Sequence, residues 1–144
     1  MIRLEEITPE NWRLGLKVAK AQEHYVSDTN RMLARAYAYR NHRSQAFVVY
    51  SDETPVGMAM YYDCEELEAY DLSQLFIDER YQGRGYGYQA ATELIARMRA
   101  DGRYRKAILC YIEGNEAAAR LYEKIGFVHT GEADGDEIIM QMDL

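Results

Sequence analysis

The chain has 144 residues, a length that suits one domain with a substantial core and leaves little room for a second. Hydrophobic residues make up 48% and charged residues 28%, values typical of a soluble globular protein. The net charge of −7 argues against nucleic-acid binding as the main task and agrees with a cationic small substrate.

The cysteines and the N-terminus indicate the compartment. Cys64 and Cys110 show neither a metal-ligand spacing nor a disulfide framework, which favours a reduced intracellular protein without a metal. Residues 1–6 lack an apolar signal core, and no apolar run approaches membrane-spanning length. We therefore expect a cytoplasmic protein that does not enter a membrane.

The first 62 residues predict two strand regions separated by two helices. Residues 2–7 alternate apolar and polar and predict a strand. Thr8 followed by Pro9 is a helix start, which predicts a helix over residues 9–21. A second helix is predicted over residues 28–39, and residues 45–51 and 56–62 predict a hairpin that turns at 52–55.

An acidic run follows the hairpin at residues 63–68. Such a run is usually a solvated loop, and the alternative is a surface that collects amines close to the acceptor site.

The central stretch, residues 72–100, predicts a strand, a glycine turn and a helix. Leu72, Leu75, Phe76 and Ile77 form a strand-length apolar run, and residues 91–98 carry apolar side chains at helical spacing. Glycines at 83, 85 and 87 leave the backbone bare where the helix begins, so that several N–H groups point outward together. The helix dipole and Arg84 add positive potential, which predicts a phosphate or pyrophosphate site.

Other interpretations of the turn are less well supported. A Walker loop needs Gly-Lys followed by Ser or Thr, which is absent. A Rossmann fingerprint needs an acidic residue at the end of a second strand, whereas Asp101 follows the helix directly in an Asp-Gly turn. A tight turn whose glycines only relieve steric strain remains an alternative.

The C-terminal part predicts a strand, a helix and a closing hairpin. The strand covers residues 106–112, and Asn115 caps a helix whose buried stripe includes Tyr122. Gly126 is expected to end this helix in a left-handed conformation, with Phe127 as its apolar partner. Residues 127–130 and 137–142 are expected to pair around Asp134-Gly135.

Two of these segments resemble the GNAT superfamily of acyl-CoA-dependent N-acetyltransferases. The run Gln82-Gly83-Arg84-Gly85-Tyr86-Gly87 fits its signature of Arg or Gln, two variable residues, Gly, a variable residue, and Gly or Ala. Residues 115–127 resemble its second motif, and the resemblance covers roughly residues 45–144. Its bacterial spermine/spermidine acetyltransferase branch is most similar in pattern.

The resemblance implies a fold and a cosubstrate. The fold is a single α/β (α+β) domain over residues 1–144, in which about four helices flank a mixed, mostly antiparallel sheet of six to seven strands. That sheet splays between its fourth and fifth strands to admit the pantetheine arm of acetyl-CoA. The residues that the resemblance assigns to the cosubstrate are Phe76, Ile77, Gln82, Gly83, Arg84, Gly85, Tyr86, Gly87, Asn115, Ala118 and Lys124.

The resemblance also assigns chemistry. Backbone N–H groups near Phe76 would stabilise the oxyanion, and Tyr122 would protonate the leaving thiolate. The region 22–28 borders the acceptor in the family, which makes Glu23, His24, Tyr25 and Asp28 candidates for substrate contact, although Asp28 is also a plain helix cap.

The group that takes the proton from the amine stays open. Some relatives carry a carboxylate where this chain has Ser73-Gln74. Glu23, Asp71, or a carboxylate acting through water are the alternatives, and Ser73 itself remains a candidate for substrate contact.

We therefore expect transfer of an acetyl group from acetyl-CoA to a primary amine of a polyamine or diamine. The alternatives are another amine acceptor (a protein N-terminus, an amino acid or an aminoglycoside) and a non-catalytic acyl-CoA-binding module. Family members are often homodimers, and the resemblance extends that expectation to this chain.

Overall fold

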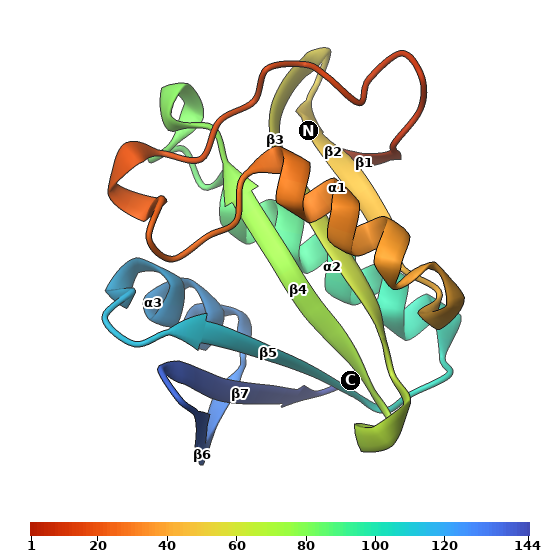
Figure 1. The fold of residues 1–144 in the computed structure, drawn as a ribbon, viewed down its shortest axis with the longest axis vertical. Coiled ribbons are helices and arrows are strands. Elements are labelled where there is room, and N and C mark those ends of the chain that lie inside the picture. Colours follow the sequence, from red (N-terminus) through yellow and green to blue (C-terminus); the bar gives the residue numbers. More distant parts are fainter.

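A computed structural model describes all 144 residues, which form one seven-stranded sheet (Figure 1). The order across the sheet is β1-β2-β3-β4-β5-β7-β6, and every neighbouring pair is antiparallel except β4 with β5. The strands are β1 (Ile2–Glu6), β2 (Gln45–Ser51), β3 (Thr54–Cys64), β4 (Ala69–Ile77), β5 (Lys106–Ile112), β6 (Val128–Asp134) and β7 (Glu137–Asp143). The mixed sheet and the hairpins that the sequence predicts are confirmed.

Three α-helices cover the two faces of this sheet. Helix α1 (Thr29–Ala38) packs through Met32 on one face, against β2 and β3. Helices α2 (Tyr86–Asp101) and α3 (Glu116–Ile125) pack together on the other face, where the larger core lies. Four short 3-10 turns connect the elements: η1 (Lys20–Gln22), η2 (Arg40–His42), η3 (Glu65–Leu67) and η4 (Glu79–Tyr81). None of the helices is both long and apolar enough to span a bilayer.

The helix ends follow from capping residues that the sequence shows. The Asp28 carboxylate accepts from the Arg31 N–H at the start of α1, and the Asn115 side chain accepts from the Ala118 N–H at the start of α3. Gly126 has a φ of 125° at the end of α3, and the buried Phe127 follows it.

The helix predicted over residues 9–21 is wrong. Thr8 and Asn11 bond their own neighbourhood instead: the Glu10 N–H donates to the Thr8 hydroxyl, and the Asn11 amide bonds the Thr8 N–H and the Glu6 carbonyl. Gly15 then takes a φ of +74°, and the Lys17 N–H donates to the Asp78 carboxylate. The segment runs as a loop over the end of β4, and three α-helices are present where about four were expected.

The sheet opens into a wedge between β4 and β5. Their parallel pairing holds only at Tyr70–Ala107 and Asp71–Ile108, near the start of both strands. From Leu72 onward, the edge of β4 that faces β5 has no strand paired to it. The edge of β5 that faces β4 is likewise unpaired from Leu109 onward. Figure 1 shows the two strands diverging from their common end. This is the splay expected between the fourth and fifth strands.

A β-bulge at Ser73 changes which side chains of β4 share a face. Tyr61 pairs with Leu72 and Met60 pairs with Gln74, so Ser73 is the extra residue. The bulge reverses the alternation of β4. As a result, Leu72 and Leu75 face the α2 core, whereas Phe76 faces the α1 side.

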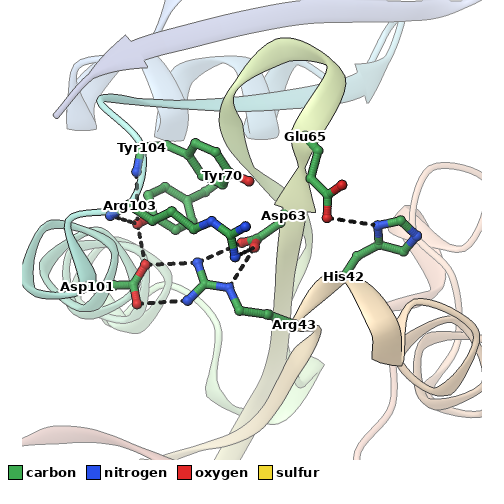
Figure 2. A network of polar contacts seen from close by, with 8 residues as sticks. All are labelled: His42, Arg43, Asp63, Glu65, Tyr70, Asp101, Arg103 and Tyr104. Atoms are coloured by element: carbon green, nitrogen blue, oxygen red, sulfur yellow. Dashed lines mark hydrogen bonds and ion pairs between the residues drawn. The ribbon is translucent and has the colours of Figure 1, made fainter.

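A polar network closes the narrow end of the wedge (Figure 2). Arg43 bonds both oxygens of the buried Asp63 and both oxygens of Asp101, which ends α2. The Tyr70 hydroxyl donates to Asp101 and accepts from the Arg103 N–H. The network thereby joins β3, β4, the end of α2 and the segment that leads into β5.

The acidic run at residues 63–68 lies at this same end of β4, away from the glycine turn. Asp63 is engaged by Arg43 and Arg103, and Glu65 faces His42 (Figure 2). The run is therefore not beside the open end of the wedge, and this position favours the expected solvated loop over the alternative of an amine-collecting surface.

Candidate active site

A cavity of about 410 Å³ lies in the open part of the wedge. Its walls are β4, the loop before α1, the glycine turn, the end of β5 and α3. No Asp, Glu, Lys or Arg side chain lines it. The lining residues that the sequence predicts are Tyr25, Ser73, Phe76, Ile77, Gln82, Gly83, Gly85, Tyr86, Gly87, Asn115, Ala118 and Tyr122.

The glycine turn presents free backbone amides to one end of this cavity. The N–H groups of residues 83–88 donate no hydrogen bond within the protein, to backbone or to side chains, and the first bonded amide is that of Gln89. Gly83 and Gly85 have φ values of 78° and 79°, which glycine adopts without strain. Six free amides around the start of a sixteen-residue helix are an arrangement that suits an anion.

Two cations flank these amides without lining the cavity. The Arg84 guanidinium lies 5.9 Å from the Tyr81 ring centre, and the Lys124 ammonium lies 4.8 Å from the ring centre of Tyr88, in the first turn of α2. Both charges add to the helix dipole at the same place. The arrangement therefore suits a ligand with more than one negative charge, such as a diphosphate.

The unpaired edge of β4 forms the floor of the cavity. Phe76 and Ile77 belong to the part of β4 that has no strand on its β5 side. An extended ligand with amide groups can bond such an edge as an added strand does. The Gln82 side chain closes the end of the edge, since its amide donates to the Ile77 carbonyl at 3.2 Å.

Tyr122 brings a hydroxyl to the opposite wall. Its ring packs edge-on against Phe127, and the residue is only 8% exposed. Burial raises the pKa of Tyr122 to about 12, so the phenol keeps its proton at neutral pH. The hydroxyl has no partner within the protein, and no fully buried polar side-chain atom lacks one, which means that the hydroxyl opens into the cavity.

The Asn115 side chain also leaves a polar group free at the cavity. Its side-chain oxygen accepts from the Ala118 N–H at 3.3 Å, which caps α3 and leaves the amide nitrogen free to donate to a ligand. The residue is 4% exposed and lines the cavity beside Ala118.

The loop before α1 forms another wall of the cavity. Tyr25 lines the cavity together with Gln22 and Val26, neighbours that the sequence does not single out. Glu23 and Asp28 instead line a separate hollow of about 470 Å³, and His24 lines neither. Of the four candidates in this segment, only Tyr25 is in the cavity.

Asp71 lies beside the cavity rather than in its wall. It is half-buried, and burial raises its pKa to about 6 although the Tyr62 hydroxyl, at the paired position of β3, acts to lower that pKa. Leu72 and Ser73, which follow it directly, are both in the wall.

Three further residues at the acceptor side were not found as site residues from the sequence. Gln74 lines the cavity, and Arg35 of α1 bonds Ser73, Gln74 and Ser27 from behind the wall at 3.3–3.4 Å. Cys110 of β5 also lines the cavity. Burial raises the pKa of the Cys110 thiol to about 11. The alternation of β5 is visible in the sequence, but the bulge that places Gln74 is not.

Comparison with known proteins gives a consistent picture. The model of the acetyltransferase (GNAT) family matches residues 4–127. The spermine/spermidine N(1)-acetyltransferase of Bacillus subtilis strain 168 is 31% identical over an alignment of 150 positions, which covers 97% of each chain.

Solved structures share the fold at lower identity. The spermidine N-acetyltransferase of Vibrio cholerae, in complex with CoA and spermine, superposes with a TM-score of 0.75 at 16% identity and covers 99% of this chain and 94% of its own. An aminoglycoside acetyltransferase in complex with coenzyme A reaches a TM-score of 0.83 at 16% identity, with coverage of 99% and 95%.

Proposed function

Because the chain belongs to the acetyltransferase (GNAT) family, we propose that it transfers an acetyl group from acetyl-CoA to a primary amine of a polyamine or diamine. The acceptor class follows from the relatives named above, and the net charge of −7 agrees with a cationic substrate.

The observation that carries the proposal is the run of free amides at residues 83–88, placed where an unpaired strand edge begins. The amides would hold the diphosphate of acetyl-CoA, with Arg84 and Lys124 adding positive charge. The β4 edge would bond the amides of the pantetheine arm, which directs the thioester into the wedge toward Tyr122.

The residues around the thioester support direct transfer in a ternary complex. A backbone N–H of β4 near Phe76 would stabilise the oxyanion that forms when the amine attacks. The Tyr122 hydroxyl would then give a proton to the departing thiolate. An acetyl-cysteine intermediate is disfavoured, because Cys110 is a thiol rather than a thiolate at neutral pH.

Release of CoA thiol across a panel of amines tests the function. We expect turnover with spermidine, spermine and short diamines, and binding of CoA in calorimetry without an amine. If an amino acid, a peptide N-terminus or an aminoglycoside is the acceptor, the panel identifies it, and the polyamine assignment fails. CoA binding with no turnover of any amine would instead support a non-catalytic acyl-CoA-binding module.

The cytoplasmic location and the homodimer belong to the same proposal. The chain's cosubstrate is a cytoplasmic metabolite, and Tyr37, 69% exposed on α1, offers apolar surface for an interface. A monomeric mass in light scattering would remove the dimer from the proposal.

A further inference from the structure

We propose that the Asp71 carboxylate accepts the proton of the attacking ammonium and that the Tyr62 hydroxyl positions it. The inference rests on the proposed function, since it assigns the proton acceptor of that reaction. It is argued from where Asp71 lies, what surrounds it and which charges it lacks.

Asp71 occupies the point where the wedge begins. It forms the last pair between β4 and β5, opposite Ile108, and beyond it the two strands part. The next two residues of β4 are in the cavity wall, and so is Cys110 of β5. The Asp71 carboxylate is near enough to the Cys110 thiol to raise its pKa. Asp71 therefore lies next to the inner end of the cavity, just outside its wall.

Asp71 is the inward carboxylate without a cationic partner. Asp63 is paired with Arg43 at 2.6 Å, and Asp78 is paired with Arg80 at 2.9 Å. Asp71 forms no ion pair. A half-buried carboxylate without an ion pair is stabilised by a nearby positive charge, and an ammonium group supplies such a charge.

The charged and titratable groups that face Asp71 come from four elements. Tyr62 of β3 is the cross-strand partner of Asp71 and lowers its pKa, and Tyr39, at the end of α1, stacks on Tyr62 with ring centres 4.1 Å apart. Arg35 of α1 lowers the pKa of Asp71 through its charge, and Glu137 of β7 raises it. Cys110 of β5 is uncharged at neutral pH because its pKa is about 11.

Burial outweighs these effects and raises the pKa of Asp71 to about 6. The carboxylate is therefore ionised at neutral pH and is roughly 100-fold more basic than an ordinary aspartate.

Asp71 lies outside the cavity wall, so the proton must reach it through water. A strand rises about 3.3 Å per residue, which places the Asp71 backbone roughly 7 Å along β4 from that of Ser73 in the wall. A bridging water can relay a proton between an ammonium group in the cavity and a base beside it. No charged side chain lines the cavity, and Asp71 is the carboxylate without an ion pair that adjoins its wall.

The proton balance closes with Tyr122. The alkylammonium gives one proton to Asp71 and becomes the free amine, whose lone pair forms the bond from nitrogen to the acetyl carbon. The bond from carbon to sulfur breaks, and the thiolate takes the Tyr122 proton. The second proton that nitrogen loses on forming the amide restores Tyr122, and the proton on Asp71 leaves to solvent.

The pH dependence of kcat/KM for spermidine tests the inference, with a thiol reagent that works in acid. In the wild type, we expect kcat/KM to rise up to about pH 6 and then to stay flat to about pH 9, because Asp71 supplies the free amine. In Asp71→Asn, kcat/KM at pH 7 should fall by about 10²–10⁴-fold. It should then rise tenfold per pH unit up to about pH 9, since only the unprotonated amine reacts.

Two further variants should shift the acid limb of the kcat/KM profile in opposite directions. Tyr62→Phe removes a hydroxyl that lowers the pKa of Asp71, so the acid limb should move to higher pH. Glu137→Gln removes a negative charge that raises it, and the limb should move to lower pH. Neither should change the affinity for CoA, because neither residue is in the cavity wall.

The outcomes separate the inference from the function. If the wild type acetylates spermidine but Asp71→Asn keeps the flat profile, Asp71 is not the proton acceptor. The same conclusion follows if Tyr62→Phe and Glu137→Gln leave the limb in place. If the wild type turns over no amine, the proposed function itself fails. Asp71→Asn should be at least as stable as the wild type in urea denaturation at pH 8, because it no longer buries an unpaired charge.

Discussion

Tyr122 shows how one side chain is prepared for a single chemical task. It is buried among apolar residues, yet its hydroxyl is left for the cavity because no group of the protein bonds it. Burial raises the pKa of Tyr122 to about 12, so that the phenol is a weaker acid than a free tyrosine. It donates best to a group that becomes strongly basic in the same dry surroundings, as a thiolate does when it leaves a thioester.

Tyr122→Phe keeps the packing against Phe127 and removes only the hydroxyl. We expect kcat to fall by about 10²-fold, with little change in the Kd for acetyl-CoA, because the lost interaction matters most in the transition state. Tyr61→Phe is the matched control, since Tyr61 is 3% exposed in the core and lies outside the cavity. An unchanged kcat in Tyr122→Phe would show that the thiolate leaves without this proton.

The sequence identifies those cavity residues whose position is set by residues close to them in the chain. Tyr122 and Asn115 are found because one short helix and its cap place both of them. Gln74 is missed because the bulge at Ser73 reverses the alternation that the sequence suggests. Arg35 is missed for another reason: its contacts with Ser73 and Gln74 join residues that are 38 and 39 positions apart.

The elements show the same division between local and distant causes. Strand β5, helix α1 and helix α3 are confirmed within a residue or two, because periodicity and caps specify them locally. The segment 9–21 has a helix start but no helix. There, side-chain bonds of Asn11 compete with the helical pattern, and Asp78 of the distant β4 end holds the Lys17 N–H.

The start of α2 allows a test of the anion site that does not depend on catalysis. Gly87 lies in the first turn of the helix without a positive φ, and an added Cβ would meet Leu121 at 3.6 Å and Ile77 at 3.8 Å, which are ordinary contacts. Gly87→Ala should therefore keep or raise the free energy of unfolding by about 0.5–1 kcal/mol. Its methyl group enters the cavity, and we expect CoA to bind at least tenfold more weakly in calorimetry.

Gly102→Ala provides the opposite pattern. Gly102 ends α2 with a φ of 70°, far from the cavity, so alanine should lower stability by about 1 kcal/mol and leave CoA affinity unchanged. Equal CoA affinity in Gly87→Ala and the wild type would mean that the bare backbone at position 87 is not needed for binding.

The wedge between β4 and β5 has one end that a polar network holds closed and one end that is open. Figure 2 shows Arg43, Asp63, Tyr70, Asp101 and Arg103 linked to one another, at the end where β4 and β5 still pair. At the other end the strand edges and the amides of the glycine turn are left unpaired. The polar groups that stabilise the fold and those that are free to bind a ligand thus lie at opposite ends of β4. A polar group that is bonded within the protein cannot also bond a ligand.

Asp63 tests this division, because it is buried and its carboxylate serves two arginines. Asp63→Ala should lower the free energy of unfolding by about 2–3 kcal/mol in urea denaturation. The loss stays below that of a fully buried pair, since the Arg43 side chain is 38% exposed and keeps Asp101. Glu65→Ala is the control: its contact with His42 is exposed, so the change should be within about 0.5 kcal/mol. CoA affinity should change less than threefold in either variant, roughly 0.6 kcal/mol or less. A large loss of affinity in Asp63→Ala would show that the far end of β4 sets the geometry of the cavity after all.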